Sequence, residues 1–158
     1  MDFSILHLRE QAQHLPSVAE WIFREWWSNS GSSVQNIENW LKTHLSDGDF
    51  PTTLIAIARG GPIGSVSLHD TEAEDRPSFR PYLGALYVSP EWRGSGVGNA
   101  LVRAVEEHAR HCGFRAVYLN AANRMLVFYE RLGWHVVERE YGHHKLNIMR
   151  RTLDQETR

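Results

Sequence analysis

Glycine occupies three alternate positions, Gly94, Gly96 and Gly98, directly after Arg93 and at the start of a stretch with helical periodicity. Glycine lets the backbone approach a ligand closely and adopt positive φ angles. The first turn of a helix presents N–H groups without intrahelical partners and carries a partial positive charge. Together these features predict a site for an anion, best filled by a phosphate or pyrophosphate group.

Two common nucleotide-binding motifs do not fit this segment. A P-loop ends in Gly-Lys-Ser/Thr, whereas Gly98 is followed by Asn99 and Ala100. A dinucleotide fingerprint spaces its glycines as G-x-G-x-x-G and has an acidic residue about 20 positions on. Here the spacing is G-x-G-x-G, and Tyr118 stands at the corresponding position. A glycine-rich turn without a ligand is the alternative, but such a turn requires neither three glycines nor a leading arginine.

The elements that must position this loop follow from hydrophobic periodicity and from turn residues. Ser33 suits the N-cap of a helix, and Gly113 suits a helix end. Because helices alternate with strands that are partly joined directly, we expect a mixed α/β (α+β) sheet with helices on its faces. The expected strands are residues 3–8, 52–58, 63–68, 81–88, 116–119, 134–137 and 145–150, and the expected helices are 16–27, 34–45, 97–112 and 124–132.

Length and composition predict a single globular domain, residues 1–158. Hydrophobic residues make up 42% and charged residues 23%, which excludes a disordered or fibrous chain. The net charge of -2 argues against nucleic acid and anionic membranes as partners. The one cysteine, Cys112, forms neither an internal disulfide nor a zinc site by itself. With no signal peptide and no apolar stretch of about 20 residues, we expect a cytoplasmic protein.

Two segments of the chain resemble motifs of the GNAT acetyltransferase superfamily. The stretch Arg93–Gly98 matches the phosphate-loop pattern Arg/Gln-x-x-Gly-x-Gly/Ala, and Leu86–Val88 with Pro90 fits the strand before it. Downstream, Phe128–Trp134 is similar to the family's Tyr-x-x-x-Gly-Phe/Tyr/Trp segment. The resemblance covers residues 3 to 153. It implies the GNAT acyltransferase fold, a splayed central sheet of about seven strands flanked by about four helices.

The resemblance further implies acetyl-CoA as co-substrate and no metal. The pyrophosphate is expected on the backbone N–H groups of the glycine loop and the first turn of the helix. The pantetheine arm is expected along Leu86–Val88, where the sheet would part after Val88, with Tyr129 near the thioester sulfur. Relatives carry an asparagine seven residues before this tyrosine, whereas Asn123 is six before it. The expected cofactor contacts are Leu86, Tyr87, Val88, Arg93, Gly94, Ser95, Gly96, Val97, Gly98, Asn99, Asn123, Phe128 and Tyr129.

Acyl transfer from a thioester to an amine needs a base, a stabilised oxyanion and a proton for the leaving thiolate. We expect the backbone N–H of Val88 to polarise the thioester carbonyl and Tyr129 to protonate the sulfur. A plain core aromatic is the alternative for Tyr129. Four residues are candidate bases: Glu25 at the end of the first helix, and His69, Asp70 and Glu72 just after the third strand.

The acceptor is expected between the first two helices and the ends of the central strands, at Trp26, Trp27, His69 and Tyr82. Beside the tryptophans, Glu72, Glu74 and Asp75 would form an anionic, aromatic mouth suited to a cationic amine. The alternative is a solvated acidic loop, above all at Glu74 and Asp75, beside two packing tryptophans. An acetyl-cysteine at Cys112 is disfavoured, because a helix C-terminus opposes a thiolate.

These residues predict an N-acetyltransferase that acts on a small-molecule amine by direct attack in a ternary complex. Three alternatives remain: a peptide N-terminal or protein-lysine acetyltransferase, a tRNA-acetylating toxin, and a non-catalytic CoA-binding sensor. The near-neutral charge counts against tRNA. Edge strands near the C-terminus would allow a homodimer. The histidine pairs 108/111 and 143/144 lack further ligands for a metal.

Overall fold

The computed structural model describes residues 2–154. The predicted order of strands and α-helices is confirmed, with short 3-10 and π segments added between them. The strands are β1 (Ser4–His7), β2 (Thr52–Ala58), β3 (Gly61–His69), β4 (Tyr82–Val88), β5 (Ala116–Ala121), β6 (His135–Tyr141) and β7 (Leu146–Thr152). The helices are η1 (Leu8–His14), α1 (Leu15–Ile22), η2 (Phe23–Trp27), α2 (Val34–Lys42), η3 (Pro90–Trp92), α3 (Val97–His111), η4 (Asn123–Met125) and α4 (Leu126–Arg131).

The seven strands form one mixed sheet in the order β1-β2-β3-β4-β5-β7-β6. Neighbouring strands are antiparallel except β4 and β5, which are parallel and share a single pair, Tyr82 with Tyr118. From Leu83 onward β4 therefore has no strand on its β5 side. The expectation that the sheet parts after Val88 is wrong in position, since β4 and β5 pair only at Tyr82, six residues before Val88.

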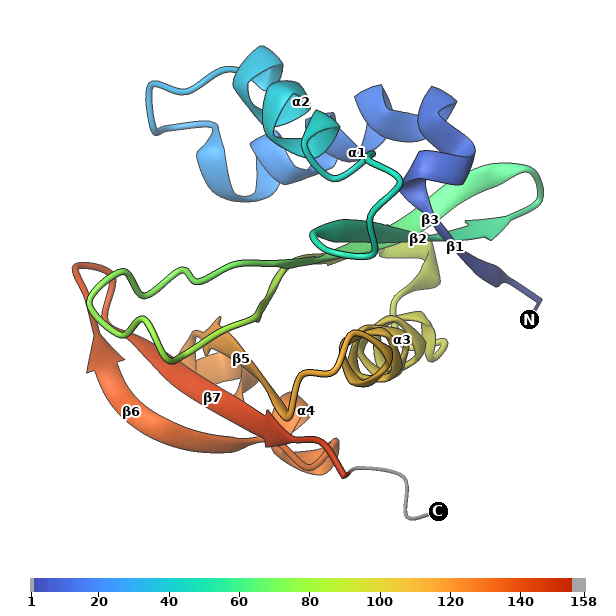
Figure 1. Ribbon diagram of the computed structural model, residues 1–158. Helices are drawn as coiled ribbons and strands as arrows, with labels where there is room; N and C mark the ends of the chain where they lie inside the picture. Colours follow the sequence, from blue (N-terminus) through green and yellow to red (C-terminus); the bar gives the residue numbers. More distant parts are fainter. Residues whose placement is uncertain (1, 155–158) are drawn as a thin grey trace.

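Helices cover both faces of the first half of the sheet (Figure 1). Alternation along β2 sends Ile55 toward the α1–α2 layer and Leu54 toward α3. Helix α3 packs directly on β3 at Gly64, where an added Cβ would lie 3.1 Å from Leu101 Cδ1. Glycine at this strand position is thus what permits the close approach of the helix. No helix within residues 2–154 combines the length and the apolar character that crossing a bilayer requires.

Element boundaries differ from the sequence expectation where tertiary contacts decide them. The helix expected over residues 16–27 ends as α1 at Ile22 and continues as the π-helix η2. The loop expected over residues 89–95 contains the 3-10 turn η3. The last two strands run further than expected, to Tyr141 and Thr152, because they pair with each other and β7 pairs with β5.

Candidate functional site

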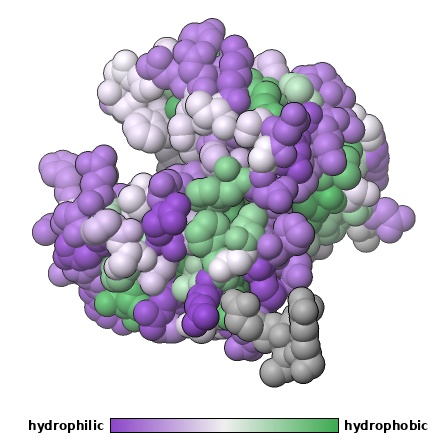
Figure 2. All heavy atoms as spheres, viewed as in Figure 1, coloured by the Kyte–Doolittle hydropathy of each residue, from purple (hydrophilic) through white to green (hydrophobic). Residues whose placement is uncertain are grey.

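A groove of about 1620 Å³ opens where β4 and β5 part. It is bounded by η2 and α2, by the exposed edge of β4, by the loop before α3, and by the end of β5 with α4. The space-filling view is hollowed between the α1–α2 layer and the β6–β7 hairpin (Figure 2). Fifteen of the residues expected at the site line this groove: Glu25, Trp26, Trp27, His69, Glu72, Leu86, Tyr87, Val88, Arg93, Gly94, Gly96, Gly98, Asn99, Phe128 and Tyr129.

The edge of β4 presents an unpaired backbone N–H to the groove at Val88. The N–H of Ser89 donates to the carbonyl of Ile63 on β3 at 2.8 Å. Successive residues of an antiparallel strand direct their backbone groups to opposite sides, so those of Val88 face away from β3. The Val88 carbonyl indeed accepts a hydrogen bond from Arg93 Nε at 2.9 Å on that side. The Val88 N–H therefore points to the open side of the strand.

A bulge interrupts β4 at Ala85. Ser65 and Ser67 of β3 pair with Tyr87 and Gly84, so β4 has one residue more than β3 over this interval. Ala85 takes up the difference with φ of +52°, in the left-handed region. Such a bulge leaves one residue out of the ladder and redirects its neighbours. It lies on the groove wall and adds a second place where backbone groups of β4 are free of β3.

The loop between β4 and α3 is open above its glycines. Gly94 and Gly96 have φ of +78° and +92°, and an added Cβ at either position would meet no atom within 4 Å. Gly96 is the N-cap of α3, and its carbonyl accepts from the Ala100 N–H at 3.0 Å. The amides that precede Ala100 in the first turn have no helix carbonyl to bond. The geometry is that of an anion cradle.

Arg93 adds a fixed cation beside this cradle. Besides its bond to Val88, its guanidinium lies 5.6 Å from the centre of the Tyr87 ring. Tyr87 in turn stacks on Trp21 of α1 with ring centres 5.1 Å apart. The stack holds the arginine at the mouth of the groove.

Tyr129 of α4 reaches the groove from the opposite side. The residue is 6% exposed and packs edge-on against Phe128 and Trp134. Its hydroxyl makes no hydrogen bond with any residue from 2 to 154. Burial raises the pKa of this phenol above its ordinary value of about 10, at which a phenol is already protonated at neutral pH. It is placed to donate a proton or a hydrogen bond into the groove.

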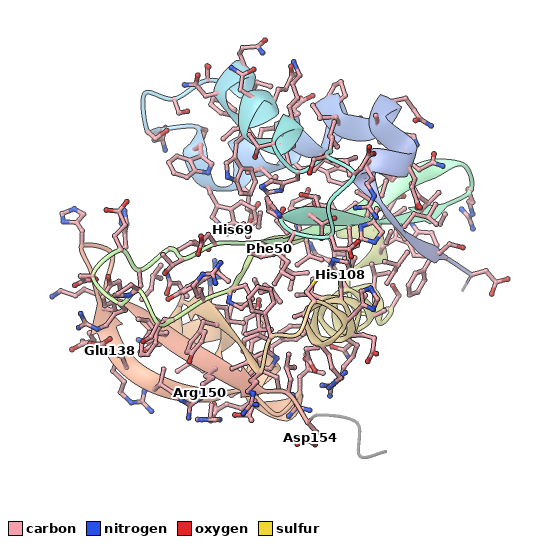
Figure 3. The ribbon with its side chains drawn as sticks, in the orientation of Figure 1. Phe50, His69, His108, Glu138, Arg150 and Asp154 are labelled. Carbon is pink, nitrogen blue, oxygen red and sulfur yellow. The ribbon has the colours of Figure 1, made fainter. Side chains whose placement is uncertain are left out.

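His69 lies at the end of β3, on the α2 side of the sheet (Figure 3), and pairs with Glu72. His69 Nε2 lies 3.2 Å from Glu72 Oε2. Both side chains lie against β4 at Gly84, where an added Cβ would be 2.6 Å from His69 Nε2 and 3.0 Å from Glu72 Oε2. Only glycine at position 84 leaves room for this pair beside the bulge.

The His69 ring packs against Trp40, and Trp40 in turn contacts a buried row of hydrogen-bonded polar side chains. The ring of Trp40 contacts both His69 and His44 edge-on, at 5.5 and 4.4 Å between ring centres. His44 is 2% exposed, and its Nδ1 lies 2.7 Å from the hydroxyl of Thr53, which bonds to Ser67. Burial, with a smaller contribution from His69, lowers the pKa of His44 to about 4.

This shift predicts an acid-sensitive fold. The unfolded chain binds a proton at His44 near pH 6.5 and the folded chain only near pH 4, so stability is full above pH 6.5 and falls as pH drops between these values. From pH 7 to pH 5, the free energy of unfolding should fall by about 2 kcal/mol more in the wild type than in His44→Gln. Urea unfolding of both proteins at the two pH values measures this difference. Equal losses would contradict it.

Some residues expected at the site lie outside the groove. Tyr82 is fully buried beneath it and has no exposed surface to offer an acceptor. Asp70 is turned away and bonds Arg80 Nε at 2.8 Å, which holds the pKa of its carboxyl below the usual value and makes it a poor base. Asp75 bonds Arg76 and Tyr141, and Glu74 is exposed beside it. Neither of these two acids lines the groove, so the anionic mouth does not include them.

Three expected cofactor contacts also have side chains directed elsewhere. The Ser95 hydroxyl donates to the Trp92 carbonyl, Val97 is fully buried, and Asn123 Oδ1 accepts from Asn147. Ser95 and Val97 can still contribute backbone N–H groups. Cys112 is half-buried rather than in the core, and burial raises the pKa of its thiol. That shift disfavours a nucleophilic thiolate.

Other groove residues were not expected from the sequence. They include Trp40, Ala85, Asn120 and His144. The Asn120 Oδ1 atom is buried without a hydrogen-bond partner among the described residues. Gly84 within a strand was a signal for the bulge. His144 comes from the β6–β7 turn, and nothing local in its sequence places it near β4.

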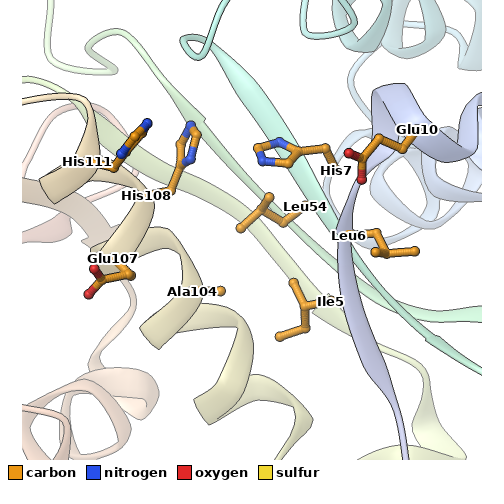
Figure 4. Close-up of a pocket in the computed structure, with 9 residues that line it drawn as sticks. All are labelled: Ile5, Leu6, His7, Glu10, Leu54, Ala104, Glu107, His108 and His111. Carbon is orange, nitrogen blue, oxygen red and sulfur yellow. The ribbon is translucent and has the colours of Figure 1, made fainter.

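A second hollow, of about 470 Å³, lies between β1 and α3 (Figure 4). The rings of His7 and His108 meet there with centres 4.9 Å apart. Each ring makes a hydrogen bond within the fold: His7 Nδ1 lies 2.7 Å from the Thr52 hydroxyl, and His108 Nε2 lies 2.6 Å from the Asp49 carbonyl. In the part of the chain that the structure describes, no three potential ligands are arranged to hold a metal.

The chain is similar to known proteins in both sequence and fold. The family model of the Acetyltransferase (GNAT) family matches residues 15–134. The chain belongs to the GNAT acetyltransferase family. A GNAT superfamily phosphinothricin acetyltransferase from Sinorhizobium meliloti, solved in complex with AcCoA, superposes with a TM-score of 0.76 at 23% identity. The superposition covers 97% of this GNAT chain and 89% of that one, and it supports the fold.

Two curated proteins are similar in sequence to this GNAT chain. A mycothiol acetyltransferase from Propionibacterium freudenreichii subsp. shermanii is 36% identical over 95 residues, 56% of this chain and 30% of that protein. Aminoglycoside N(6')-acetyltransferase type 1 from Stenotrophomonas maltophilia is 35% identical over 78 residues, 48% of this chain and 51% of that protein. The matches thus span about half or less of these relatives.

Proposed function

We propose that this GNAT chain transfers the acetyl group of acetyl-CoA to a primary amine of a small molecule, by direct attack in a ternary complex. The observation that carries the proposal is the meeting of the free edge of β4 with the first turn of α3 in one groove. The two similar proteins are named as acetyltransferases, one of them for aminoglycosides. The solved neighbour with bound AcCoA has the same fold.

The residues of the groove fit the parts of acetyl-CoA. The open space above Gly94 and Gly96, with the free amides of α3, suits the pyrophosphate. Arg93 and Arg124 supply positive charge on the same side. The unpaired edge of β4 from Leu83 to Val88 suits an extended amide chain that adds to the sheet as a strand does.

Acetyl-CoA, when bound, supplies an acetyl group activated as a thioester. The Val88 N–H, directed to the open side of β4, would hold the carbonyl oxygen. A hydrogen on His69 Nε2 donates to Glu72 and fixes the orientation of the carboxylate, which takes the proton from the attacking amine nitrogen. The protonated Tyr129 hydroxyl is the donor for the departing sulfur.

Glu72→Gln should lower kcat about 100-fold, with little change in the KM for acetyl-CoA, because the amide cannot accept a proton. Steady-state thiol release at saturating acceptor, with the acetyl-CoA concentration varied, measures both constants. Glu74→Gln is the matched control, since it makes the same change two residues on, outside the groove. Equal kcat in wild type and Glu72→Gln would exclude Glu72 as the base.

The proposed activity is tested by thiol release from acetyl-CoA with a panel of polyamines, amino acids, aminoglycosides and short peptides. Release with small amines is expected. Release confined to peptides would favour the N-terminal or lysine acetyltransferase. Binding of acetyl-CoA without release across the panel would leave a CoA-binding sensor.

A further inference from the structure

Two consecutive tryptophans stand exposed on the wall of the groove. Trp26 and Trp27 are 47% and 45% exposed, and with Val127 they are the exposed large hydrophobic side chains of residues 2–154. Both line the groove and both belong to the π-helical turn η2. Such turns occur frequently at functional sites, and indole surface left in water at a groove marks a place for a ligand.

The charges of the groove are separated between its two sides. Among the described residues, its two carboxylates, Glu25 and Glu72, lie on the side of η2 and the end of β3. Its two guanidinium groups, Arg93 and Arg124, lie on the side of the cradle and η4. The tryptophan side therefore attracts cations and repels anionic acceptors. Indole faces reinforce this preference, because they attract ammonium groups directly.

Glu72 and Glu25 lie at two different places in the groove. Glu72 is held by His69 against Gly84, next to the free edge of β4, where the reacting nitrogen must arrive. Glu25 comes from η2, beside Trp26, and makes no ion pair with any residue from 2 to 154. An acceptor with one amino group would leave Glu25 and both indoles without a partner.

We propose that the acceptor carries a second ammonium group, held by Glu25, Trp26 and Trp27 while the first is acetylated at the edge of β4. This inference rests on the proposed function and names its substrate class, an amine with at least two positive charges. The second charge binds as an ammonium and takes no part in the proton transfer.

Three amines with the same four-carbon chain test the proposal: n-butylamine, putrescine and γ-aminobutyrate. The kcat/KM of putrescine should exceed that of n-butylamine by about tenfold or more, the equivalent of one charged contact. γ-Aminobutyrate should be the poorest acceptor. Glu25→Gln and Trp26→Ala should reduce the putrescine advantage toward one, because each should lower kcat/KM for putrescine more than kcat/KM for n-butylamine.

Glu20→Gln is the matched control, since it removes one carboxylate on α1, outside the groove, where it faces Arg24 at 3.8 Å. It should keep the putrescine advantage. Equal kcat/KM for putrescine and n-butylamine, or variants that lower both alike, would overturn the second-cation site while leaving the acetyltransferase intact.

Binding provides a readout that does not depend on turnover. Putrescine should change the indole fluorescence of the wild type saturably, and n-butylamine should do so only at far higher concentration. The putrescine response should be lost in Trp26→Ala. Saturable binding without thiol release from any amine would support the cation site and count against the proposed function. No saturable change with putrescine would overturn the site.

Discussion

Gly96→Asp is expected to weaken acetyl-CoA binding by about 100-fold or more. Gly96 is the N-cap of α3, and an aspartate there would accept hydrogen bonds from the amides that the pyrophosphate needs. Its charge would also repel the phosphates. Two charged hydrogen bonds at about 1.5–3 kcal/mol each account for a change of this size. Calorimetric titration with acetyl-CoA measures it.

Gly113→Asp separates this effect from backbone strain. Gly113 follows the other end of α3 with φ of +89°, close to the +92° of Gly96, and nothing lies within 4 Å of either added Cβ. Both variants introduce the same charge in the same backbone region. Gly113→Asp should bind acetyl-CoA as the wild type does. Equal affinity in all three proteins would show that the phosphates do not lie on the first turn of α3.

Tyr129→Phe should lower kcat at least about tenfold and leave the dissociation constant of acetyl-CoA nearly unchanged. The phenol has no hydrogen-bond partner among residues 2–154, so removing its oxygen leaves the packing against Phe128 and Trp134 intact. What disappears is the proton donor for the leaving sulfur, a buried phenol that is protonated at neutral pH. Rates at saturating substrate and calorimetry separate the two effects.

Tyr118→Phe is the control for this substitution. Tyr118 is 8% exposed, stacks on Phe79 and does not line the groove, so the loss of its hydroxyl should change neither constant. A Tyr129→Phe enzyme with wild-type kcat would reduce Tyr129 to a core aromatic. The leaving sulfur would then take its proton from another group, or leave as the thiolate.

Structural features that depend only on residues close together in the sequence were predictable. The glycine loop and α3 could be located because glycine spacing and helical periodicity act within a few residues. Ser33 caps α2 as expected, with its side chain accepting from the Asn36 N–H. The order of the strands along the chain was predictable for the same reason, since each strand is a short apolar run between turn signals.

Features that depend on distant partners were not predictable. The sequence predicts Asp70 as a base, but the guanidinium of Arg80, ten residues on, bonds its carboxylate. Tyr82 looked like an acceptor contact, but the parallel pair with Tyr118 buries it under the groove. The π-helical turn that carries both exposed tryptophans has no local sequence signal. Gly84 indicates that β4 contains a bulge, but the position of the bulge at Ala85 is set by the register against β3.

Backbone amide shifts in a titration of the ¹⁵N-labelled protein with acetyl-CoA test the central claim most directly. The amides of residues 93–99 and of Leu86–Val88 should move together and saturate with one ligand per chain. The amide of Gly113, at the far end of α3, should stay in place. Unchanged shifts in the loop and in β4, or shifts confined to the hollow between β1 and α3, would contradict the assignment of this groove to acetyl-CoA.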